Sequence, residues 1–508
     1  MQLTWKKTWS LLFFIVLLGA GLRFFDLGGN SFVADEFLDI NSSYGYFKTG
    51  EWKAWDFNFD QPASMNQNDA RDERAFLYKW QVAQLFHFLP PTEGTARSVS
   101  ALWGVFTILL MFWAGWFYTK KKTIGLLSAF LFAVSVSALI FDRRLRMYAM
   151  FTPVYLAFAT TLFAFFECKY QGKIQIFQKA WERLGVNVLY LIPVGVLGGM
   201  SLYLHLLSAN IVPVVAVYFF VLALLAWKRG EGLKNKYAVL FGVGAVATIL
   251  FLIFLPDMAK QFTKEVTLFD NHYSYFGYIL TDFAHPFFGA ILGLFGAWFL
   301  AKKLDRPKAS LWLLLSVVVP LVLSVWFWRR NAGPQYIFFA QSFLLILSSI
   351  GVFGILRIAK EKFPRIKKRA FFITLALAIL LLPQYGYFFQ ENNTYHETTS
   401  GENPNYRKIF AYFKKNKEAG EVLITRNFRN YYFAKSEVQV YDFGGELSKS
   451  KFSVAELQAI VSEHPKGWLI VSENDYDYIS NEAEAYFKEN FTRVSNSQVR
   501  GPIEIYRW

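Results

Sequence analysis

Residues 8–39 read TWSLLFFIVLLGAGLRFFDLGGNSFVADEFLD, an apolar run that ends in a segment containing polar and charged residues. A run of about twenty apolar residues is long enough to cross the hydrocarbon core of a bilayer as a helix. Lys6 and Lys7 precede the run, as basic residues precede the apolar core of a secretory signal peptide. The run continues through Arg23 into the polar segment, so we expect an uncleaved first membrane span.

Similar apolar runs recur along most of the chain. Apolar residues make up 54% of the sequence and charged residues only 18%, whereas a soluble domain has about 25% charged residues. We therefore predict an α-helical polytopic membrane protein with about eleven transmembrane helices. The predicted spans are 8–27, 99–118, 123–141, 147–166, 185–205, 207–227, 237–256, 283–301, 309–328, 336–357 and 370–390.

The net charge of +15 reflects lysines and arginines that cluster in short loops between the apolar runs. In a soluble protein such a charge would suggest a nucleic-acid partner, but between spans it orients the chain in the bilayer, and we expect no nucleic-acid partner. By the positive-inside rule we expect a multi-pass protein of the plasma or inner membrane with a cytoplasmic N-terminus and an extracytoplasmic C-terminus. The basic loops are Lys6-Lys7, Lys120 to Lys122, 169–183, Lys228 to Lys236, Lys302-Lys303 and Lys360 to Arg369.

This topology divides the sequence into two expected domains, a transmembrane domain over 1–395 and an extracytoplasmic domain over 396–508. The transmembrane domain includes a long extracytoplasmic loop, 28–98, in which Asp72 to Leu89 has apolar residues at helical spacing. We expect an amphipathic helix there, lying on the outer membrane surface and ended by Pro90-Pro91.

The C-terminal segment is predicted to form a soluble α/β domain. Short runs rich in β-branched and aromatic residues alternate in it with helical patterns. It contains no glycine-rich phosphate loop, acidic metal cluster or nucleophile motif, which favours a lectin-like or scaffold role over catalysis. Strands are expected at 422–426, 438–443, 468–472 and 503–507, and helices at 404–416, 453–463 and 481–490.

An acidic pair, Asp35-Glu36, follows the first span on the outer side. Such a pair is common by chance, but a carboxylate at the membrane face can also act as a general base, taking the proton of an acceptor hydroxyl as its oxygen attacks a sugar carbon. If the segment is helical, Asp39 shares a face with Asp35, and a site for a divalent cation also becomes possible. Cys168 is the only cysteine, which excludes an internal disulfide and any multi-cysteine metal site.

A second charged cluster, Asp142 to Tyr148 (DRRLRMY), opens a later apolar run. Asp142 is placed to cap the N-terminus of that helix. Arg143 and Arg146 would then share one helix face, and Arg144 and Tyr148 another. Paired guanidinium groups suit a lipid-linked phosphate or pyrophosphate, which they can hold bidentately, although ordinary contact with lipid head groups explains them equally well.

Other outer-side residues are single candidates. Arg97 lies just outside the second span, and His205 lies where the fifth span ends, a place where a lone histidine is more often a hydrogen-bonding group than a catalyst. Arg329 and Arg330, near Tyr336, lie on the side that the positive-inside rule disfavours. A bound anion is the usual reason for cations in such a place.

Taken together, these motifs resemble those of the GT-C membrane glycosyltransferases, in the branch of dolichyl-phosphate-mannose-protein mannosyltransferases and lipid A aminoarabinose transferases. The matching features begin with an arginine-containing first span followed by Asp35-Glu36, and with the stretch from Ala96 to Gly104. Arg143 to Tyr148 is similar to the R-x-x-R-M-Y motif of that branch, and Tyr203-Leu204-His205 to its Tyr-Thr-His element. The resemblance covers residues 10–210 well and the remaining spans by layout alone.

The sequence also departs from that branch. Many relatives have an Arg-Tyr pair entering a late span with a proline a few residues on, whereas this chain has Gln335-Tyr336 and Gln341. Arg329 or Arg330 is the candidate replacement for the missing charge. Asp72-Glu73-Arg74 stands where relatives often have a proline-rich stretch. These differences bear on the identity of the acceptor more than on the reaction type.

The resemblance implies an inverting glycosyltransferase that moves a sugar from a polyprenyl-phosphate-linked donor to a protein, lipid or glycan acceptor on the outer face. It implies Asp35 as the general base, with Glu36 orienting the site or binding a cation. The residues implied to hold the donor phosphate are Arg97, Arg143, Arg146, Tyr148, His205, Arg329 and Arg330. The alternatives are an oligosaccharide ligase or polymerase, a lipid-linked saccharide transporter, and a non-catalytic scaffold. A transporter is disfavoured because the charges collect at one membrane face.

Overall fold

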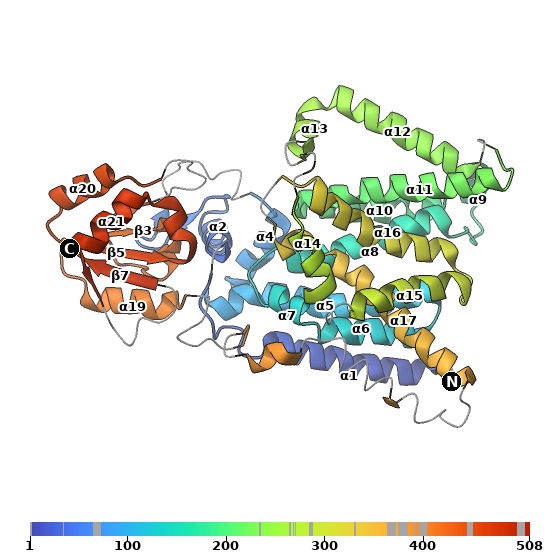
Figure 1. Cartoon of the computed structure of the whole chain (residues 1–508), viewed down its shortest axis with the longest axis horizontal. Helices are drawn as coiled ribbons and strands as arrows, with labels where there is room; N and C mark the ends of the chain where they lie inside the picture. Colours follow the sequence, from blue (N-terminus) through green and yellow to red (C-terminus); the bar gives the residue numbers. More distant parts are fainter. Residues whose placement is uncertain are drawn as a thin grey trace. The chain divides into compact units, whose positions relative to one another are not determined.

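The computed structural model describes residues 3–33, 35–63, 73–232, 235–263, 266–267, 269, 271–283, 288–329, 332–362, 372–373, 385–390, 393–395, 404–443, 451–494 and 503–508 (Figure 1). The chain divides into two compact units. The helical unit comprises Met1–Arg23, Ser100–Asp142 and Met147–Tyr385, and the mixed unit comprises Phe24–Val99, Arg143–Arg146 and Gly386–Trp508. The domain boundary expected at residue 395 stays a prediction.

Most of the predicted spans are helices in the structure. Within the described residues, seven helices are long and apolar enough to cross a membrane, and up to nine spans result if two bent helix pairs each count as one. The seven are α1 (Trp5–Phe24), α5 (Glu93–Thr119), α8 (Tyr148–Glu167), α11 (Ile211–Lys228) with the preceding η2 (Leu206–Asn210), α12 (Lys236–Phe254), α16 (Pro307–Trp326) and α17 (Ala340–Lys362). The bent pairs are α6 (Lys122–Ala133) with α7 (Val136–Asp142), and α9 (Gln175–Leu184) with η1 (Val188–Tyr190) and α10 (Leu191–Leu204).

Two predicted spans differ from these. The run at 283–301 forms α15 (Phe288–Lys302), an apolar helix of only 15 residues. The run at 370–390 lies mostly outside the described residues, so this span stays a prediction. The α-helical polytopic class predicted from the sequence is confirmed by the spans that the structure describes.

The span predicted at 123–141 is broken between α6 and α7, whose axes differ by 61°. A break within a span leaves backbone carbonyl groups without helical partners, and the protein must satisfy them internally. The buried Arg23 side chain donates hydrogen bonds to the carbonyl groups of Phe132 and Ala133 at 3.3 and 3.0 Å. Its Nε also bonds the Asp142 carboxylate at 2.8 Å. Arg23 therefore stabilises the bend between the two helices.

Asp142 does not cap the helix that follows it, contrary to the prediction. It is the last residue of α7, while α8 begins at Tyr148 after Met147, with no side-chain cap. Residues 143–146 between them are not helical, so the predicted helix faces of this motif do not exist. The physical reason is that Asp142 has a stronger partner than a helix N-terminus, because its carboxylate forms a buried ion pair with Arg23.

Gly104 of α5 leaves room for the Arg23–Asp142 ion pair. A Cβ atom at this position would overlap both the Asp142 carboxylate and the Arg23 guanidinium. We expect Gly104→Ala to destabilise the protein by about 1–3 kcal/mol, the usual cost of overpacking, measured as a lower midpoint of thermal unfolding in detergent. Gly199→Ala in α10 is the matched control, because a Cβ atom there meets nothing within 4 Å. Equal midpoints for the two variants would contradict this role of Gly104.

Several of the basic loops lie at the same end of the helical unit. The positive-inside rule predicts that these loops share one side of the membrane. Contacts join the segments around residues 3, 120, 167, 236 and 306 at this end. The contacts are Lys122 with the Leu3 carbonyl, Tyr118 with Thr160, and Glu167 with Lys236 and Lys308. Most of the segment from Lys360 to Arg369 lies outside the described residues. The expected orientation of this end toward the cytoplasm stays a prediction.

We call residues 28–98 the first outer loop, after the side predicted for it. Its described residues form two helices and a short hairpin. Its elements are α2 (Glu36–Thr49), β1 (Trp55–Asp56), β2 (Gln61–Pro62) and α4 (Phe76–Leu85). The amphipathic helix predicted over 72–89 corresponds to α4, which packs against α2 and starts later, after Ala75 in the left-handed region (φ 55°). Its expected place on the membrane surface stays a prediction.

The C-terminal part of the mixed unit is a layered α/β domain with a five-stranded sheet in the order β4-β3-β5-β7-β6. Strand β3 runs parallel to β4 and β5, while β7 runs antiparallel to β5 and β6. One helix, α19, covers one face of the sheet, and α20 and α21 cover the other (Figure 1). All strands and helices predicted here are confirmed, and β6 is additional. The elements are α19 (Tyr406–Asn416), β3 (Val422–Thr425), η7 (Asn427–Tyr431), β4 (Val440–Asp442), α20 (Val454–Glu463), β5 (Gly467–Ser472), α21 (Asn481–Asn490), β6 (Thr492–Arg493) and β7 (Ile503–Arg507).

Candidate functional site

Glu36, the first residue of α2, forms a buried two-point ion pair with Arg97. Arg97 donates from Nε to Oε1 at 2.9 Å and from Nη2 to Oε2 at 2.7 Å. The backbone N–H of Leu145 also donates to Oε1, at 2.6 Å. Because Leu145 belongs to the non-helical segment 143–146, Glu36 joins the loop after the first span to the segment after α7.

Arg97 uses its remaining donors within the same unit. These N–H groups bond the backbone carbonyl oxygens of Leu27, Asn30 and Ser31. The side chain is only 5% exposed. A buried guanidinium with its donors occupied by protein groups is not available to a phosphate, so the contacts of Arg97 favour a role in shaping the loop.

Burial alone would raise the pKa of Glu36, but the Arg97 charge and the hydrogen bonds from Arg97 and the Leu145 amide outweigh it and hold the pKa below 4.5. A carboxylate with a lowered pKa stabilises the folded state above its unfolded pKa, and this stabilisation is lost as the pH falls through its folded pKa. We therefore expect the thermal stability of the protein in detergent to fall as the pH is lowered below 4.5. The Glu36→Gln variant should show a shallower decline, and parallel curves would contradict the expectation.

Asp35 immediately precedes α2, and its side chain is 58% exposed. Arg146 lies between Asp35 and Asp39, with Nη2 at 2.8 Å from Asp35 Oδ2 and Nη1 at 2.9 Å from Asp39 Oδ2. Asp39 is buried and also lies 3.6 Å from Nζ of Lys79 in α4, a residue that no sequence motif marks. The prediction that Asp35 and Asp39 share a face is confirmed, since one arginine contacts both.

Asp35 and Glu36 do not converge on a common point, because each pairs with a different arginine. Both oxygens of Glu36 accept hydrogen bonds, from Arg97, the Leu145 amide and the Val33 amide. Within the described residues, no group of three or more His, Cys, Asp or Glu side chains is arranged to hold a metal ion. The donor set of this pair therefore does not fit a shared divalent cation.

The arginines of the 143–146 segment differ in accessibility. Arg143 is buried, and its guanidinium lies 4.3 Å from the ring centroid of Tyr395. Arg143 donates hydrogen bonds to oxygen atoms of Phe25, Asp26 and Thr394. Arg144 is exposed, and its charge helps to lower the pKa of Glu36. Arg144 is thus the arginine of this segment with the best access to an anionic ligand.

Tyr148, His205 and Tyr336 lie together in the helical unit. The ring centroids of Tyr148 and His205 are 5.5 Å apart, and those of His205 and Tyr336 are 6.4 Å apart. His205 Nδ1 accepts a hydrogen bond from the backbone N–H of Leu207 at 3.1 Å, which caps η2. This is the kind of hydrogen bond expected of a lone histidine at the end of a span, and the role of His205 at the donor phosphate stays a prediction.

Gln341 is one of the departures from the branch that this chain resembles, in which proline is common at this position. Its hydrogen bonds give a structural reason for the glutamine. Its buried amide donates hydrogen bonds to Ser135 Oγ at 2.7 Å and to the Phe283 carbonyl at 3.0 Å. Ser135 lies at the break between α6 and α7, so Gln341 is a second polar support of the bend. Arg329 is exposed in the helical unit, and Arg330 lies outside the described residues.

Comparisons with known proteins match the fold at low sequence identity. No protein-family model and no curated protein sequence matches the chain. The oligosaccharyltransferase of Archaeoglobus fulgidus, solved with a tethered acceptor peptide, matches with a TM-score of 0.62 at 12% identity over 99% of this chain and 74% of that one. ArnT of Cupriavidus metallidurans, solved with undecaprenyl phosphate, matches with a TM-score of 0.54 at 10% identity over 98% and 97%. The chain has the GT-C fold.

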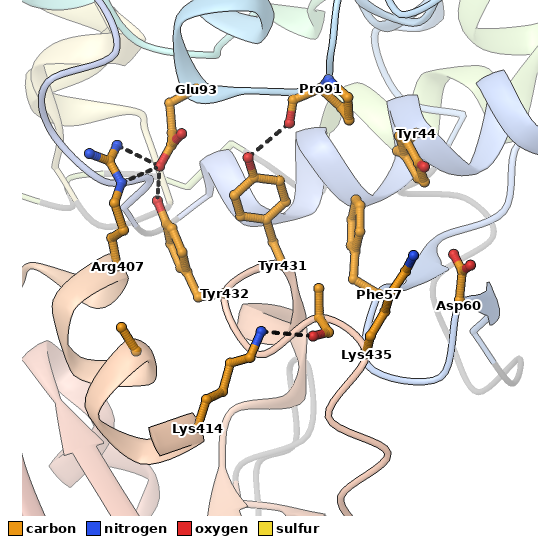
Figure 2. Close-up of a pocket in the computed structure, with 12 residues that line it drawn as sticks. Tyr44, Phe57, Asp60, Pro91, Glu93, Arg407, Lys414, Tyr431, Tyr432 and Lys435 are labelled. Carbon is orange, nitrogen blue, oxygen red and sulfur yellow. Dashed lines mark hydrogen bonds and ion pairs between the residues drawn. The ribbon is translucent and has the colours of Figure 1, made fainter. Parts of the chain in front are cut away.

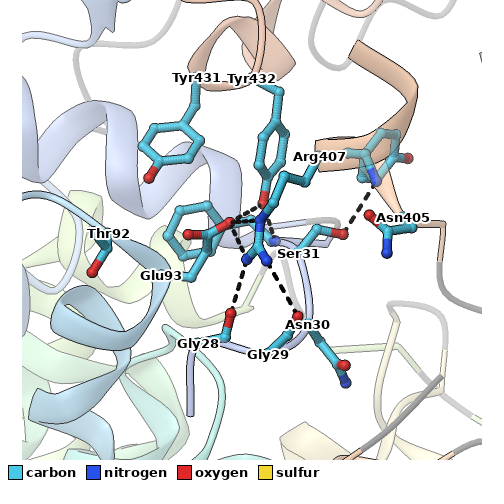
Figure 3. A network of polar contacts seen from close by, with 12 residues as sticks. Gly28, Gly29, Asn30, Ser31, Thr92, Glu93, Asn405, Arg407, Tyr431 and Tyr432 are labelled. Carbon is cyan, nitrogen blue, oxygen red and sulfur yellow. Dashed lines mark hydrogen bonds and ion pairs between the residues drawn. The ribbon is translucent and has the colours of Figure 1, made fainter. Parts of the chain in front are cut away.

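One polar network of this GT-C chain was not predicted from its sequence (Figure 3). Glu93, at the start of α5, accepts hydrogen bonds at Oε1 from Arg407 at 2.7 Å and from the Tyr432 hydroxyl at 2.9 Å. Arg407 also donates to the carbonyl groups of Gly28 and Gly29. Glu93 and Arg407 are 314 positions apart, and no local pattern pairs them. The network holds the C-terminal α/β domain against the first outer loop within the mixed unit.

Proposed function

We propose that the chain is an inverting membrane glycosyltransferase that moves a sugar from a polyprenyl-phosphate-linked donor to an acceptor on the extracytoplasmic face. The observation that carries the proposal is the exposed Asp35 carboxylate, held by Arg146 next to the buried Glu36–Arg97 pair. The fold supports it, because ArnT was solved with undecaprenyl phosphate and the A. fulgidus oligosaccharyltransferase AglB with a dolichol-phosphate.

Asp35 is the proposed general base. Its carboxylate takes the proton of an acceptor hydroxyl, whose oxygen forms a new bond to the anomeric carbon of the donor sugar. The bond between that carbon and the phosphate oxygen breaks, and the polyprenyl phosphate leaves with the electron pair. Attack opposite the leaving group inverts the anomeric centre. Arg144 and Arg146 supply the positive charge that stabilises the phosphate as its negative charge grows.

The other candidate residues have different proposed roles. Arg97 and Arg143 are positioning residues, because protein oxygens occupy their donors. Glu36 is also a positioning residue, since it binds Arg97 and the Leu145 amide. The further proposed contacts of the donor phosphate are Tyr148, His205, Arg329 and Arg330. The proposed relationship to the protein mannosyltransferase-like branch rests on the sequence motifs.

Mass spectrometry of surface glycans and glycoproteins, from cells with and without the gene, tests the proposal. We expect one sugar to be missing from an extracytoplasmic glycan when the gene is absent. The purified full-length protein should then restore that sugar from a polyprenyl-phosphate-linked donor. Unchanged surface glycans together with no transfer by the purified protein would overturn the proposal.

A second candidate is the transfer of a preassembled oligosaccharide. The TM-score of 0.62 to the A. fulgidus oligosaccharyltransferase supports it. The mass added to the acceptor separates the two reactions, because a single-sugar transferase adds one monosaccharide and an oligosaccharide ligase adds a whole chain. We expect the mass of the acceptor to increase by one monosaccharide.

Arg146 is expected to act on the phosphate and also through Asp35, which it holds in place. Arg146→Ala should lower kcat by about 10- to 100-fold, because a base that is not held in place is rarely oriented for proton transfer. Arg146→Lys should restore part of the loss, since lysine keeps the charge but not the two-point geometry. Lys53→Ala, at an exposed cation of the same outer loop, is the control. A higher KM with an unchanged kcat would contradict the positioning role.

A further inference from the structure

A groove of about 680 Å³ opens in the mixed unit, at a place that no sequence motif marks (Figure 2). One side is formed by α2 and the turn between β1 and β2, and the other by α19 and the η7 segment. Both sides belong to the mixed unit. The groove therefore lies between the first outer loop and the C-terminal α/β domain.

Aromatic rings form much of the groove wall. Tyr44 and Phe57 stack with ring centroids 4.6 Å apart, and Phe57 meets Tyr431 edge to face at 5.2 Å. The Tyr431 hydroxyl donates a hydrogen bond to the Pro91 carbonyl at 2.8 Å, which fixes the ring. Tyr44 and Tyr431 are only partly buried, so ring surface remains open to a ligand.

Charged groups surround these rings. Lys414, Lys435 and Asp60 line the groove and are exposed. Ala411 and Ala434 also line it, and their small side chains leave the space between the charged groups open. The groove therefore combines an apolar aromatic wall with hydrogen-bond donors and an acceptor at its edge.

We propose that this groove binds the saccharide part of the acceptor, an inference that rests on the proposed glycosyltransferase function. A pyranose ring has C–H groups on a face that packs on an aromatic ring, and hydroxyl groups around its edge that bond to charged side chains. The residues that line the groove supply both aromatic rings and charged side chains. A peptide bound by strand addition would use the backbone of an open strand edge, whereas this groove is lined by side chains from helices and turns.

The groove wall also contacts the loop that carries the proposed base. Phe32 and Phe37 flank Asp35 in the sequence. Phe32 packs edge to face on Tyr431 with centroids 5.1 Å apart, and Phe37 packs on Tyr432 at 5.7 Å. A saccharide seated on these tyrosines would therefore contact the aromatic cluster that includes the two phenylalanines on either side of Asp35 in the sequence.

A groove-filling variant tests the proposal. Ala411→Trp places a bulky side chain in the groove from the exposed surface of α19, and Lys415→Trp places the same side chain on that helix outside the groove lining. The labelled full-length proteins in detergent are applied to an array of neutral and uronic-acid-containing oligosaccharides. We expect the wild type and Lys415→Trp to bind a common subset, and Ala411→Trp to bind it at least tenfold more weakly.

Other results would overturn the proposal. These are no binding to any saccharide on the array, equal binding by Ala411→Trp, or binding only to an unglycosylated Ser/Thr-rich peptide on the same array. The Asp35→Asn variant should keep its array binding, because binding does not need the base. If the wild-type protein transfers no sugar, the proposed function is wrong. If it transfers sugar but Ala411→Trp binds saccharides as tightly as the wild type, only the proposed role of the groove is wrong.

Discussion

Asp35→Asn is expected to reduce sugar transfer by about 10²- to 10⁴-fold, the usual contribution of a general base. Asparagine has nearly the same shape as aspartate but cannot take the acceptor proton. Because the Asp35 side chain is 58% exposed, its ion pair with Arg146 contributes little to folding. Initial rates of transfer by the purified protein, from a polyprenyl-phosphate-linked sugar, measure the effect.

The control for Asp35→Asn is Glu51→Gln, which neutralises another exposed carboxylate of the same outer loop. Both variants should express and unfold like the wild type, since exposed substitutions of this kind usually change stability by less than about 0.5 kcal/mol. Only Asp35→Asn should lose activity. Transfer by Asp35→Asn at a rate near that of the wild type would remove Asp35 from the role of base.

Glu36→Ala, one residue away, is expected to fail mainly in folding. The substitution leaves Arg97 buried without its counter-charge, and breaking a buried pair in this way costs about 3–5 kcal/mol. It also leaves the Leu145 amide without its acceptor. We expect a low yield of folded protein and a clearly lower midpoint of thermal unfolding in detergent.

Glu361→Ala is the matched control, because it breaks an exposed ion pair with Arg357 on α17. Exposed pairs contribute about 0–1 kcal/mol, so this variant should unfold near the wild-type temperature. A double variant, Glu36→Gln with Arg97→Gln, should be less destabilised than the sum of the two single changes, because the two side chains act as a pair. Equal effects of Glu36→Ala and Glu361→Ala would contradict the proposed importance of the buried pair.

The spans and the elements of the C-terminal domain could be predicted because each rests on a local pattern. Apolar runs of sufficient length predicted helices such as α8 and α16, and short runs rich in β-branched and aromatic residues predicted β3 and β5. The bend between α6 and α7 could not be predicted in this way. No proline or glycine marks the break, and its support comes from Arg23, 110 positions from Ala133.

The sequence indicated which residues belong to the candidate site, but not how their side chains pair or which of them are buried. Asp35 and Glu36 are neighbours with the same chemistry, yet one is exposed and the other is buried. Their difference depends on partners far away in the sequence, since Arg97 and Leu145 lie 61 and 109 positions from Glu36. The helix cap predicted for Asp142 was wrong for the same reason, because the Asp142 carboxylate forms an ion pair with Arg23, which is distant in the sequence.

The ion pair of Arg23 and Asp142 constrains the order in which the chain can enter a bilayer. An arginine at the centre of a lone membrane helix costs about 2.5–3.5 kcal/mol. Arg23 lies in the last turn of α1, where the cost is smaller. Asp142 is 119 residues further along, so during synthesis α1 is complete long before its counter-charge exists. We expect α1 to remain at the protein-lined insertion site, or with its arginine at the water interface, until α6 and α7 arrive. The early helices would then enter the lipid phase as one assembled group rather than one at a time.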